Sequence, residues 1–315
     1  MSGLILNEPT QFYKAISSSN IIPGDTLYLR GGTYRGDWTL DIAGTLEAPI
    51  TIKPYNLEPV IIDGTLTFGR PYVKIMDVEF TNSNTDRNLW DSGITMSQTG
   101  CWLIGCNIHD MHSDGVNWFG SGTGGVVECR ISNCGSYAEG QMNDFGHAIY
   151  THNNGGGLRL IARNLLLDQV GRYSIHIYSA GENYLKDYTC ENNVVLHPVH
   201  TGGGLGLVDF IYRNNIQSGG YCQHGRYSVQ ANDTALIQDN VFIDLSSYYV
   251  EAGWTDLTET SNIVWNGKPD NRAGYTVQAK PANWSQFIPF TLSERWSGIQ
   301  ASIVDGVFDA VMVTR

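Results

Sequence analysis

The chain has 315 residues and a formal net charge of −12, and charged residues make up only 16% of it. This acidic balance argues against a nucleic-acid partner, because binding a phosphate backbone requires lysines and arginines. No segment approaches the apolar length of a membrane span, and the start lacks the basic and apolar regions of a signal peptide. We therefore expect no membrane partner. The location stays open, and both an extracellular and a virion-associated protein are compatible with the sequence.

The first predicted elements are short. Abundant glycine (36) and tyrosine (17) are typical of a β-rich protein with many tight turns. Residues 8–20 predict a short helix with Phe12, Tyr13 and Ile16 on one face. After a turn at residues 23–25, brief strands separated by further turns follow.

A repeated strand pattern begins at Val73 and continues along most of the chain. Its polar-to-apolar junctions fall at Asn107, Arg130, Asn164, Asn193, Asn215 and Asn240. Intervals of 23, 34, 29, 22 and 25 residues indicate a solenoid, in which each turn buries its face on its neighbours. Asparagine suits such a corner because it tolerates left-handed backbone and can bond to the next asparagine in a ladder. We interpret these asparagines as structural.

A second strand type lies between the first ones, and its alternation divides its side chains between two faces. The inward positions are Ile94, Val116, Ile149, Ile175 and Val229, and the outward ones are Thr95, Asn117, Tyr150, His176 and Gln230. Insertions at residues 82–92 and 135–145 are expected to form two walls at one edge, with further loops at 197–203 and 219–227. Long loops on one edge of a rigid solenoid are where function usually lies.

Six cysteines are present, and two pairs, Cys101 with Cys106 and Cys129 with Cys134, have the same spacing. The spacing is not that of a CxxC metal or redox motif, which favours small core residues over a disulfide or metal pair. We expect a single domain with an N-terminal cap at 1–22, coils at 23–266, and an irregular C-terminal coil and cap at 267–315.

Three stretches together resemble the right-handed parallel β-helix, or pectate-lyase-like, superfamily. They are residues 23–34, the asparagine-anchored repeats, and residues 292–308. The resemblance implies an all-β fold, a single right-handed parallel β-helix of roughly ten coils with an N-terminal helical cap and a C-terminal cap. This superfamily holds lyases, hydrolases, esterases, epimerases, phage tailspikes and inert scaffolds, so the fold leaves the activity open.

Catalytic motifs of the superfamily match poorly. The chondroitinase B and alginate lyase branch uses a lysine and an arginine, often with calcium held by carboxylates. The central coils offer one lysine, Lys186, and no convincing carboxylate triplet. Hence we predict no cofactor and no metal site, and calcium is compatible but not indicated. Gly146-His147-Ala148 and Asp114-Gly115 only faintly resemble polygalacturonase motifs.

All eight histidines lie between His109 and His224, which suggests a site, although histidine can also serve at turns. Asp114 and His147 align on neighbouring coils, so an acid–base pair is one interpretation and a simple turn at Asp114 the other. Glu139 and Asp144 on a wall loop could hydrolyse a glycosidic bond, or be solvated loop acids. The candidate catalytic residues are therefore Asp114, His147, Glu139 and Asp144.

Flat rings and cations near the same edge are candidates for binding a sugar chain, since aromatic faces stack on sugar rings and arginine pairs with carboxylates. The alternative is packing within the coils or salt bridges to nearby acids. These candidate substrate-binding residues are Tyr150, His176, Arg172, Tyr173, Tyr178, Trp118, Trp90 and His112.

The function that we predict is cleavage of a polysaccharide in a groove on the strand face. Hydrolysis is placed slightly ahead of β-elimination, because acids are available and the lysine–arginine pair is missing. A phage tail depolymerase is compatible, and such proteins are usually homotrimers. The alternative is a non-catalytic carbohydrate-binding or structural β-helix of a virion or cell surface.

Overall fold

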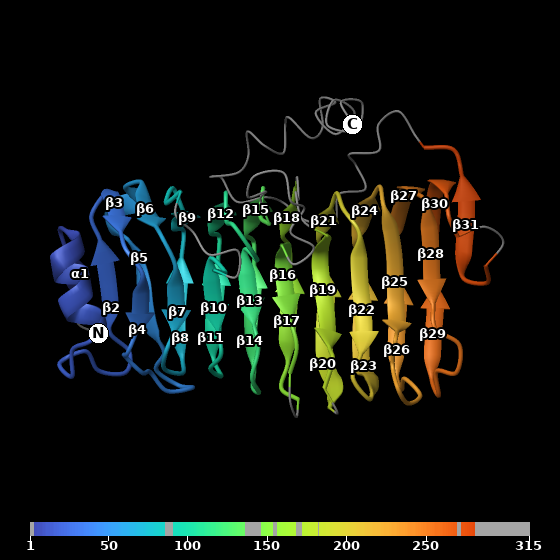
Figure 1. Cartoon of the computed structure of the whole chain (residues 1–315), viewed down its shortest axis with the longest axis horizontal. Helices are drawn as coiled ribbons and strands as arrows, with labels where there is room; N and C mark the ends of the chain where they lie inside the picture. The colour runs from blue at the N-terminus through green and yellow to red at the C-terminus, as the bar shows by residue number, and fades with distance from the viewer. Residues whose placement is uncertain are drawn as a thin grey trace.

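Three parallel sheets run side by side along the long axis of the molecule in a computed structural model (Figure 1). The structure describes residues 3–85, 91–135, 146–153, 156–167, 172–181, 183–269 and 272–280. Each coil contributes one strand to each sheet, so neighbouring strands in a sheet come from successive coils. The predicted all-β fold, a parallel β-helix of about ten coils, is confirmed.

The first sheet has eleven strands within the described residues, and the second has nine. The first sheet consists of β1 (Gly3–Leu6), β2 (Thr26–Leu29), β5 (Ile50–Pro54), β8 (Val73–Met76), β11 (Cys101–Ile104), β14 (Gly124–Val127), β17 (Arg159–Ala162), β20 (Tyr184–Glu191), β23 (Gly206–Arg213), β26 (Ala235–Gln238) and β29 (Leu257–Thr260). The second consists of β4 (Trp38–Leu40), β7 (Leu66–Phe68), β10 (Ile94–Met96), β13 (Val116–Trp118), β16 (His147–Thr151), β19 (Tyr173–Ser179), β22 (Val199–Gly203), β25 (Tyr221–Arg226) and β28 (Ser247–Val250).

The third sheet adds another eleven described strands. They are β3 (Gly32–Arg35), β6 (Val60–Asp63), β9 (Glu79–Thr81), β12 (Asn107–His109), β15 (Arg130–Ser132), β18 (Leu165–Leu166), β21 (Val194–Val195), β24 (Ile216–Ser218), β27 (Val241–Leu245), β30 (Asn262–Gly267) and β31 (Tyr275–Gln278). Apolar side chains of all three sheets point inward and form one continuous core along most of the axis. No helix in the described part of the chain is both long and apolar enough to cross a bilayer.

The helix α1 (Pro9–Ile16) lies at the N-terminal end of the coils (Figure 1). It buries Phe12, Ala15 and Ile16, and the Phe12 ring packs edge-on against Tyr34 and Trp38. The expectation for Tyr13 is wrong, because its side chain is 63% exposed. A helix turns about 100° per residue, which carries Tyr13 away from the face that Phe12 and Ile16 share. The predicted boundaries of the caps stay predictions, and residues 281–315 lie outside the described residues.

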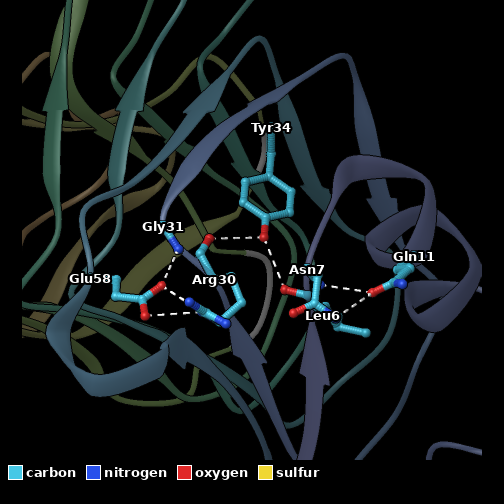
Figure 2. A network of polar contacts seen from close by, with 7 residues as sticks. All are labelled: Leu6, Asn7, Gln11, Arg30, Gly31, Tyr34 and Glu58. Atoms are coloured by element: carbon cyan, nitrogen blue, oxygen red, sulfur yellow. Dashed lines mark hydrogen bonds and ion pairs between the residues drawn. The ribbon is translucent and has the colours of Figure 1, made fainter.

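Polar contacts join the first coils to the segment before α1 (Figure 2). The Tyr34 hydroxyl lies 3.1 Å from the carbonyl oxygen of Leu6 and 3.0 Å from that of Arg30. The Arg30 side chain in turn contacts the Glu58 carboxylate at 2.8 Å, and Glu58 also accepts a hydrogen bond from the Gly31 main chain. These contacts tie β1 to the two coils that follow it.

What looks like one long strand in each repeat is two strands in two sheets. Between β8 and β9, Asp77 has a φ of 56°, and this left-handed residue turns the chain through the corner. The same turn is made by Asn192 and Asn214, each directly before an asparagine of the ladder. The left-handed position predicted for the repeated asparagines is therefore occupied by the residue in front of them.

The asparagine ladder exists, and it consists of Asn164, Asn193, Asn215, Asn240 and Asn262. The Nδ2 of each of the first four donates to the Oδ1 of the next asparagine at 3.0 or 3.1 Å, and all five side chains are buried. The structural interpretation is thus confirmed for this set.

Asn107 and Arg130 stand outside the ladder. Asn107 pairs with Arg130, and Arg130 pairs with Leu165, one position past Asn164, so the predicted junction is displaced by one residue in these coils. The main-chain N–H of Cys129 donates to the Asn164 Oδ1 at 2.9 Å, which shows that Cys129 takes the corner position in its coil. All six cysteines are free and buried, as the sequence predicts.

One outward-facing column runs along the second sheet. Thr67, Thr95, Asn117, Tyr150, His176, His200, Gln223 and Tyr249 follow one another in register. The predicted alignment of Thr95, Asn117, Tyr150 and His176 is confirmed. The prediction for Gln230 is wrong, because residues 228–231 form no strand and β25 supplies Gln223 instead. Residues 197–203 and 219–227, expected as loops, contain β22 and β25.

Candidate functional site

A pocket of about 520 Å³ opens over this column, above β13, β16, β19 and β22. Seven of the residues selected from the sequence line it: Asp114, His147, Tyr150, Arg172, Tyr173, His176 and Tyr178. The lining is completed by five residues outside the list of candidate site residues: Ser92, Ser113, Asn117, His200 and Tyr227. A larger hollow of about 630 Å³ lies between β1 and α1, but no histidine, tyrosine or arginine lines it.

His147 is the best-anchored side chain of the pocket, with only 3% of its surface exposed. Its Nδ1 accepts a hydrogen bond from the main-chain N–H of Tyr173 at 3.2 Å, and its Nε2 lies 3.0 Å from the Nδ1 of His176. Burial, with a smaller contribution from the positive charge of Arg172, lowers the pKa of His147 to about 3. The ring is therefore neutral at pH 7.

Asp114 holds the main chain under this ring. Its Oδ1 accepts a hydrogen bond from the main-chain N–H of His147 at 2.9 Å. Side-chain pairing of Asp114 with His147 was expected, and the observed contact instead runs to the backbone, because the carboxyl lies beneath the strand start. Burial raises the pKa of Asp114 well above its ordinary value, although the hydrogen bonds from His147 and Ser92 act in the opposite direction.

His176 and His200 stand next to each other in the outward column, with ring centroids 5.0 Å apart. The Tyr178 ring stacks on His176 with centroids 5.2 Å apart, and the centre of the Tyr150 ring lies 5.1 Å from that of His176. Burial lowers the pKa of His176 well below its ordinary value, and the neighbouring histidines add to the effect.

His200 is the unusual member of the pair. Only 2% of its surface is exposed, and neither ring nitrogen has a hydrogen-bond partner among the described residues. Burial lowers its pKa to about 4, and the charges of Arg226 and Arg172 contribute further. Buried polar atoms in proteins nearly always find a partner, so this ring has unused hydrogen-bonding capacity at the pocket.

Two arginines make the pocket locally positive in an acidic protein. Arg172 lies 5.3 Å from the centre of the Tyr173 ring, and its charge lowers the pKa of all three pocket histidines. Arg226 stacks at 4.7 Å on Tyr227, and its charge also lowers the pKa of His200. Neutral histidines beside cationic arginines favour an anionic ligand.

Several residues selected from the sequence lie elsewhere. The Trp118 ring is only 1% exposed and packs in the core under the guanidinium of Arg159, which is 4.2 Å away. Trp118 cannot offer its face to a sugar, because its position in β13 points inward. His112 is described but does not line the pocket. Trp90, Glu139 and Asp144 lie outside the described residues.

The sequence did contain a signal for the missed histidine. Val199-His200-Thr201 repeats the alternation of Ile175-His176-Ile177, with an apolar residue before an outward histidine. The glycines that follow at positions 202–204 suggested a loop, and they hid the strand. Tyr227 had no comparable signal, because it lies just past the end of β25.

The described residues of the pocket do not form a calcium site. No group of three or more histidine, cysteine, aspartate or glutamate side chains suited to a metal occurs among the described residues. The single carboxylate that lines the pocket there, that of Asp114, is directed at the His147 main chain.

Comparisons with known proteins bear on the fold. No protein-family model matches the chain. A pectate lyase of Emericella nidulans, PEL9, is 40% identical over 68 residues, which are 21% of this chain and 16% of that protein. The match therefore spans a small part of the length of that relative.

Solved structures match over far more of the chain. The alginate lyase from Paenibacillus sp. str. FPU-7 aligns with 80% of this chain and 98% of its own, at a TM-score of 0.51 and 14% identity. A mannuronic acid specific polysaccharide family 6 lyase from human gut microbiota aligns with 98% of this chain and 100% of its own, at a TM-score of 0.50 and 12% identity. These matches confirm the resemblance at the level of the fold: the chain has the parallel β-helix fold of these two structures.

Proposed function

We propose that this protein cleaves an acidic polysaccharide by β-elimination in the pocket above β16, β19 and β22. The observation that carries the proposal is His200, a buried neutral histidine without a hydrogen-bond partner among the described residues, in the same pocket as Arg172. Elimination next to a carboxylate requires a base for the carbon-bound proton, a cation for the carboxylate and a proton donor for the leaving oxygen.

Arg172 binds the carboxylate of a uronate unit and stabilises the charge that develops on it. His200 takes the proton from the carbon next to the carboxylate. The electron pair of that C–H bond forms a carbon–carbon double bond as the glycosidic C–O bond breaks. The hydroxyl of Tyr178, whose ring lies 5.9 Å from that of His200, gives its proton to the leaving oxygen. His200 then releases its proton to solvent, and Tyr178 takes up a proton from solvent, so that both side chains return to their starting states.

Access to His200 requires a small rearrangement. The Tyr227 ring lies 5.7 Å from the His200 ring and is itself 61% exposed, so a bound chain can displace it without disturbing the core. Catalytic hydrogen bonds commonly become aligned only when substrate binds.

Hydrolysis, which the sequence slightly favours, has less support. It needs two carboxyl groups on opposite sides of the scissile bond. Glu139 and Asp144, the acids predicted for that role, lie outside the described residues, and the third candidate catalytic acid, Asp114, is only 4% exposed and bonds to main chain. The two solved structures of similar extent are both named as lyases, which is a reason to test elimination first.

The test is incubation with a panel of neutral and acidic polysaccharides, with reducing ends and ultraviolet absorbance of unsaturated products followed together. Elimination predicts that both signals rise, and only with uronate-containing chains. Reducing ends without absorbance would establish a hydrolase instead, and binding without either product would indicate a carbohydrate-binding protein. Matched variants locate the site: His200→Ala and Arg172→Ala should greatly slow the rise in absorbance.

The controls remove the same residue types far from the pocket. His109 lies in β12 of the third sheet, and Arg70 is an exposed partner of Asp41 near the N-terminal end. His109→Ala and Arg70→Ala should therefore retain wild-type activity. Equal losses in the pocket variants and these controls would contradict the assignment of the site.

A further inference from the structure

The protonation state of His147 follows from its surroundings. The main-chain N–H of Tyr173 is a permanent donor, and it lies 3.2 Å from the His147 Nδ1. That nitrogen must therefore be an acceptor and carry no proton. A neutral imidazole carries one N–H, so the proton of His147 is on Nε2. A charged His147 would direct a second N–H at the Tyr173 N–H, which disfavours that state.

The tautomer of the next ring is fixed in the same way. The His147 Nε2 lies 3.0 Å from the His176 Nδ1, and because Nε2 carries the proton, it donates. The Nδ1 of His176 is thus an acceptor, and the proton of a neutral His176 is on its Nε2. No hydrogen bond from His176 Nε2 to another described residue is present, and the His176 side chain lines the pocket.

We infer that His147 is a positioning residue, which fixes His176 as an N–H donor directed into the pocket beside Arg172, and that together they form a binding site for a carboxylate. The Tyr173 main chain donates to His147, and His147 donates to His176. The Nε2–H of His176 is then the donor left for a ligand. The ligand group that matches an N–H beside a guanidinium is an anionic oxygen pair.

Two further contacts support a positioning role. The main-chain N–H of His147 is bound by the Asp114 carboxylate at 2.9 Å, so the backbone beneath the ring is held as well. The His147 and His176 rings cross nearly edge to face, at 71° with centroids 4.5 Å apart, which directs the His147 Nε2 at its partner. A histidine fixed as a donor cannot also be the resting base, which leaves that role to His200.

The inference rests on the proposed function only for the nature of the ligand. The tautomer itself can be measured on the ligand-free protein. Nitrogen-15 spectra of the histidine rings distinguish a protonated nitrogen from an unprotonated one, and His176→Ala identifies the signals of His176. We expect His176 to show N–H at Nε2 and an unprotonated Nδ1. The reverse tautomer would overturn the inference, whatever the activity.

Two variants separate positioning from packing. His147→Phe keeps a planar ring but removes both nitrogens, and His147→Gln keeps an acceptor and a donor on one side chain. We expect His176 to become a mixture of tautomers in His147→Phe and to return to the Nε2–H form in His147→Gln. A His176 spectrum unchanged in His147→Phe would contradict the role of His147, provided that thermal melting shows both variants folded.

Binding provides the second measurement. Galacturonic acid is the probe, with galactose as its neutral counterpart, and calorimetry gives both affinities. Loss of the fixed donor in His147→Phe should weaken galacturonic acid binding by about tenfold and leave galactose nearly unchanged. Equal weakening of both sugars would show that His147 only supports the fold. A protein that binds galacturonic acid but releases no unsaturated product would refute elimination while it keeps the carboxylate site.

Discussion

The Nδ2 of Asn193 donates to the Oδ1 of Asn215 at 3.0 Å, in the middle of a buried column of five asparagines. The same oxygen also accepts a hydrogen bond from the main-chain N–H of Asn193. The Nδ2 of Asn215 donates hydrogen bonds to the carbonyl of Cys190 and to the Oδ1 of Asn240. The Asn215 side chain thus satisfies polar groups of the coil before it and the coil after it, and its removal affects both.

Asn215→Ala is therefore expected to destabilise the fold strongly. A buried donor or acceptor left unsatisfied costs about 1–3 kcal/mol, and this change leaves several at once, so a loss of about 3 kcal/mol or more is expected. Urea unfolding measures it. Asn20→Ala, at an exposed asparagine before the first coil, is the control and should change the unfolding free energy very little. Equal stability of the two variants would show that the ladder contributes nothing.

Asp114→Asn should alter stability in a pH-dependent way. Burial raises the pKa of Asp114, so the folded state holds this proton more tightly than the unfolded state does. Stability from this group is therefore lost as the pH rises through the raised pKa. The asparagine keeps the acceptor for the His147 N–H but cannot ionise. The melting temperature of Asp114→Asn minus that of wild type should therefore increase as the pH is raised from acidic to alkaline values. A difference that stays constant with pH would contradict the raised pKa.

The pH profile of the reaction should reflect His200. Its pKa of about 4 means that the ring is neutral, and able to accept a proton, at any pH well above 4. The acid limb of kcat/KM should accordingly lie near pH 4, well below the value of about 6.5 for an unperturbed histidine. His200→Ala should lower kcat by about 10²–10⁴-fold, the usual contribution of a general base. An acid limb near pH 6.5 would point to a different base.

His224 should make the fold sensitive to acid. It is fully buried between Thr201 and Cys222, and burial lowers its pKa to about 3. The unfolded state binds this proton near pH 6.5 and the folded state only near pH 3, so stability is present above 6.5 and is lost as the pH falls toward 3. The protein therefore loses about 1.4 kcal/mol of stability for each pH unit below 6.5 within this range.

The measurement is the melting temperature between pH 7 and pH 4. In wild type it should fall steeply, and in His224→Gln it should fall less, because one buried group that resists protonation is gone. His109→Gln is the control for the loss of any histidine, because His109 lies in a different sheet and its side chain is partly exposed. Parallel curves for all three proteins would contradict the role of His224.

Repetition made the fold predictable, and local exceptions to it produced the errors. Alternation placed Tyr150 and His176 in one column, because every coil must bury the same face. It failed at residues 228–231, which alternate in the same way but lie past the end of β25, where Gln223 is the residue that pairs with His200. Alternation alone does not distinguish two such neighbouring stretches.

The chemistry of the candidate site was less accessible from sequence than its position. Trp118 was selected as a sugar platform because aromatic residues often are, but its place in β13 is an inward one. The link between Asp114 and His147 runs through a main-chain N–H, and such a contact depends on how two coils stack. Composition and spacing indicate which residues are near, and they say little about which atoms meet.

The alignment of the outward-facing column of the second sheet does not depend on the length of the connections that follow the asparagine ladder. His200 follows Asn193 by seven positions, Gln223 follows Asn215 by eight, and His176 follows Asn164 by twelve, yet all three lie in one register. Connections of different length thus leave the column intact. For protein engineering, this makes the turn between the third and second sheets a place for grafting new loops, and ligand specificity could be redesigned there while the rings below keep their alignment.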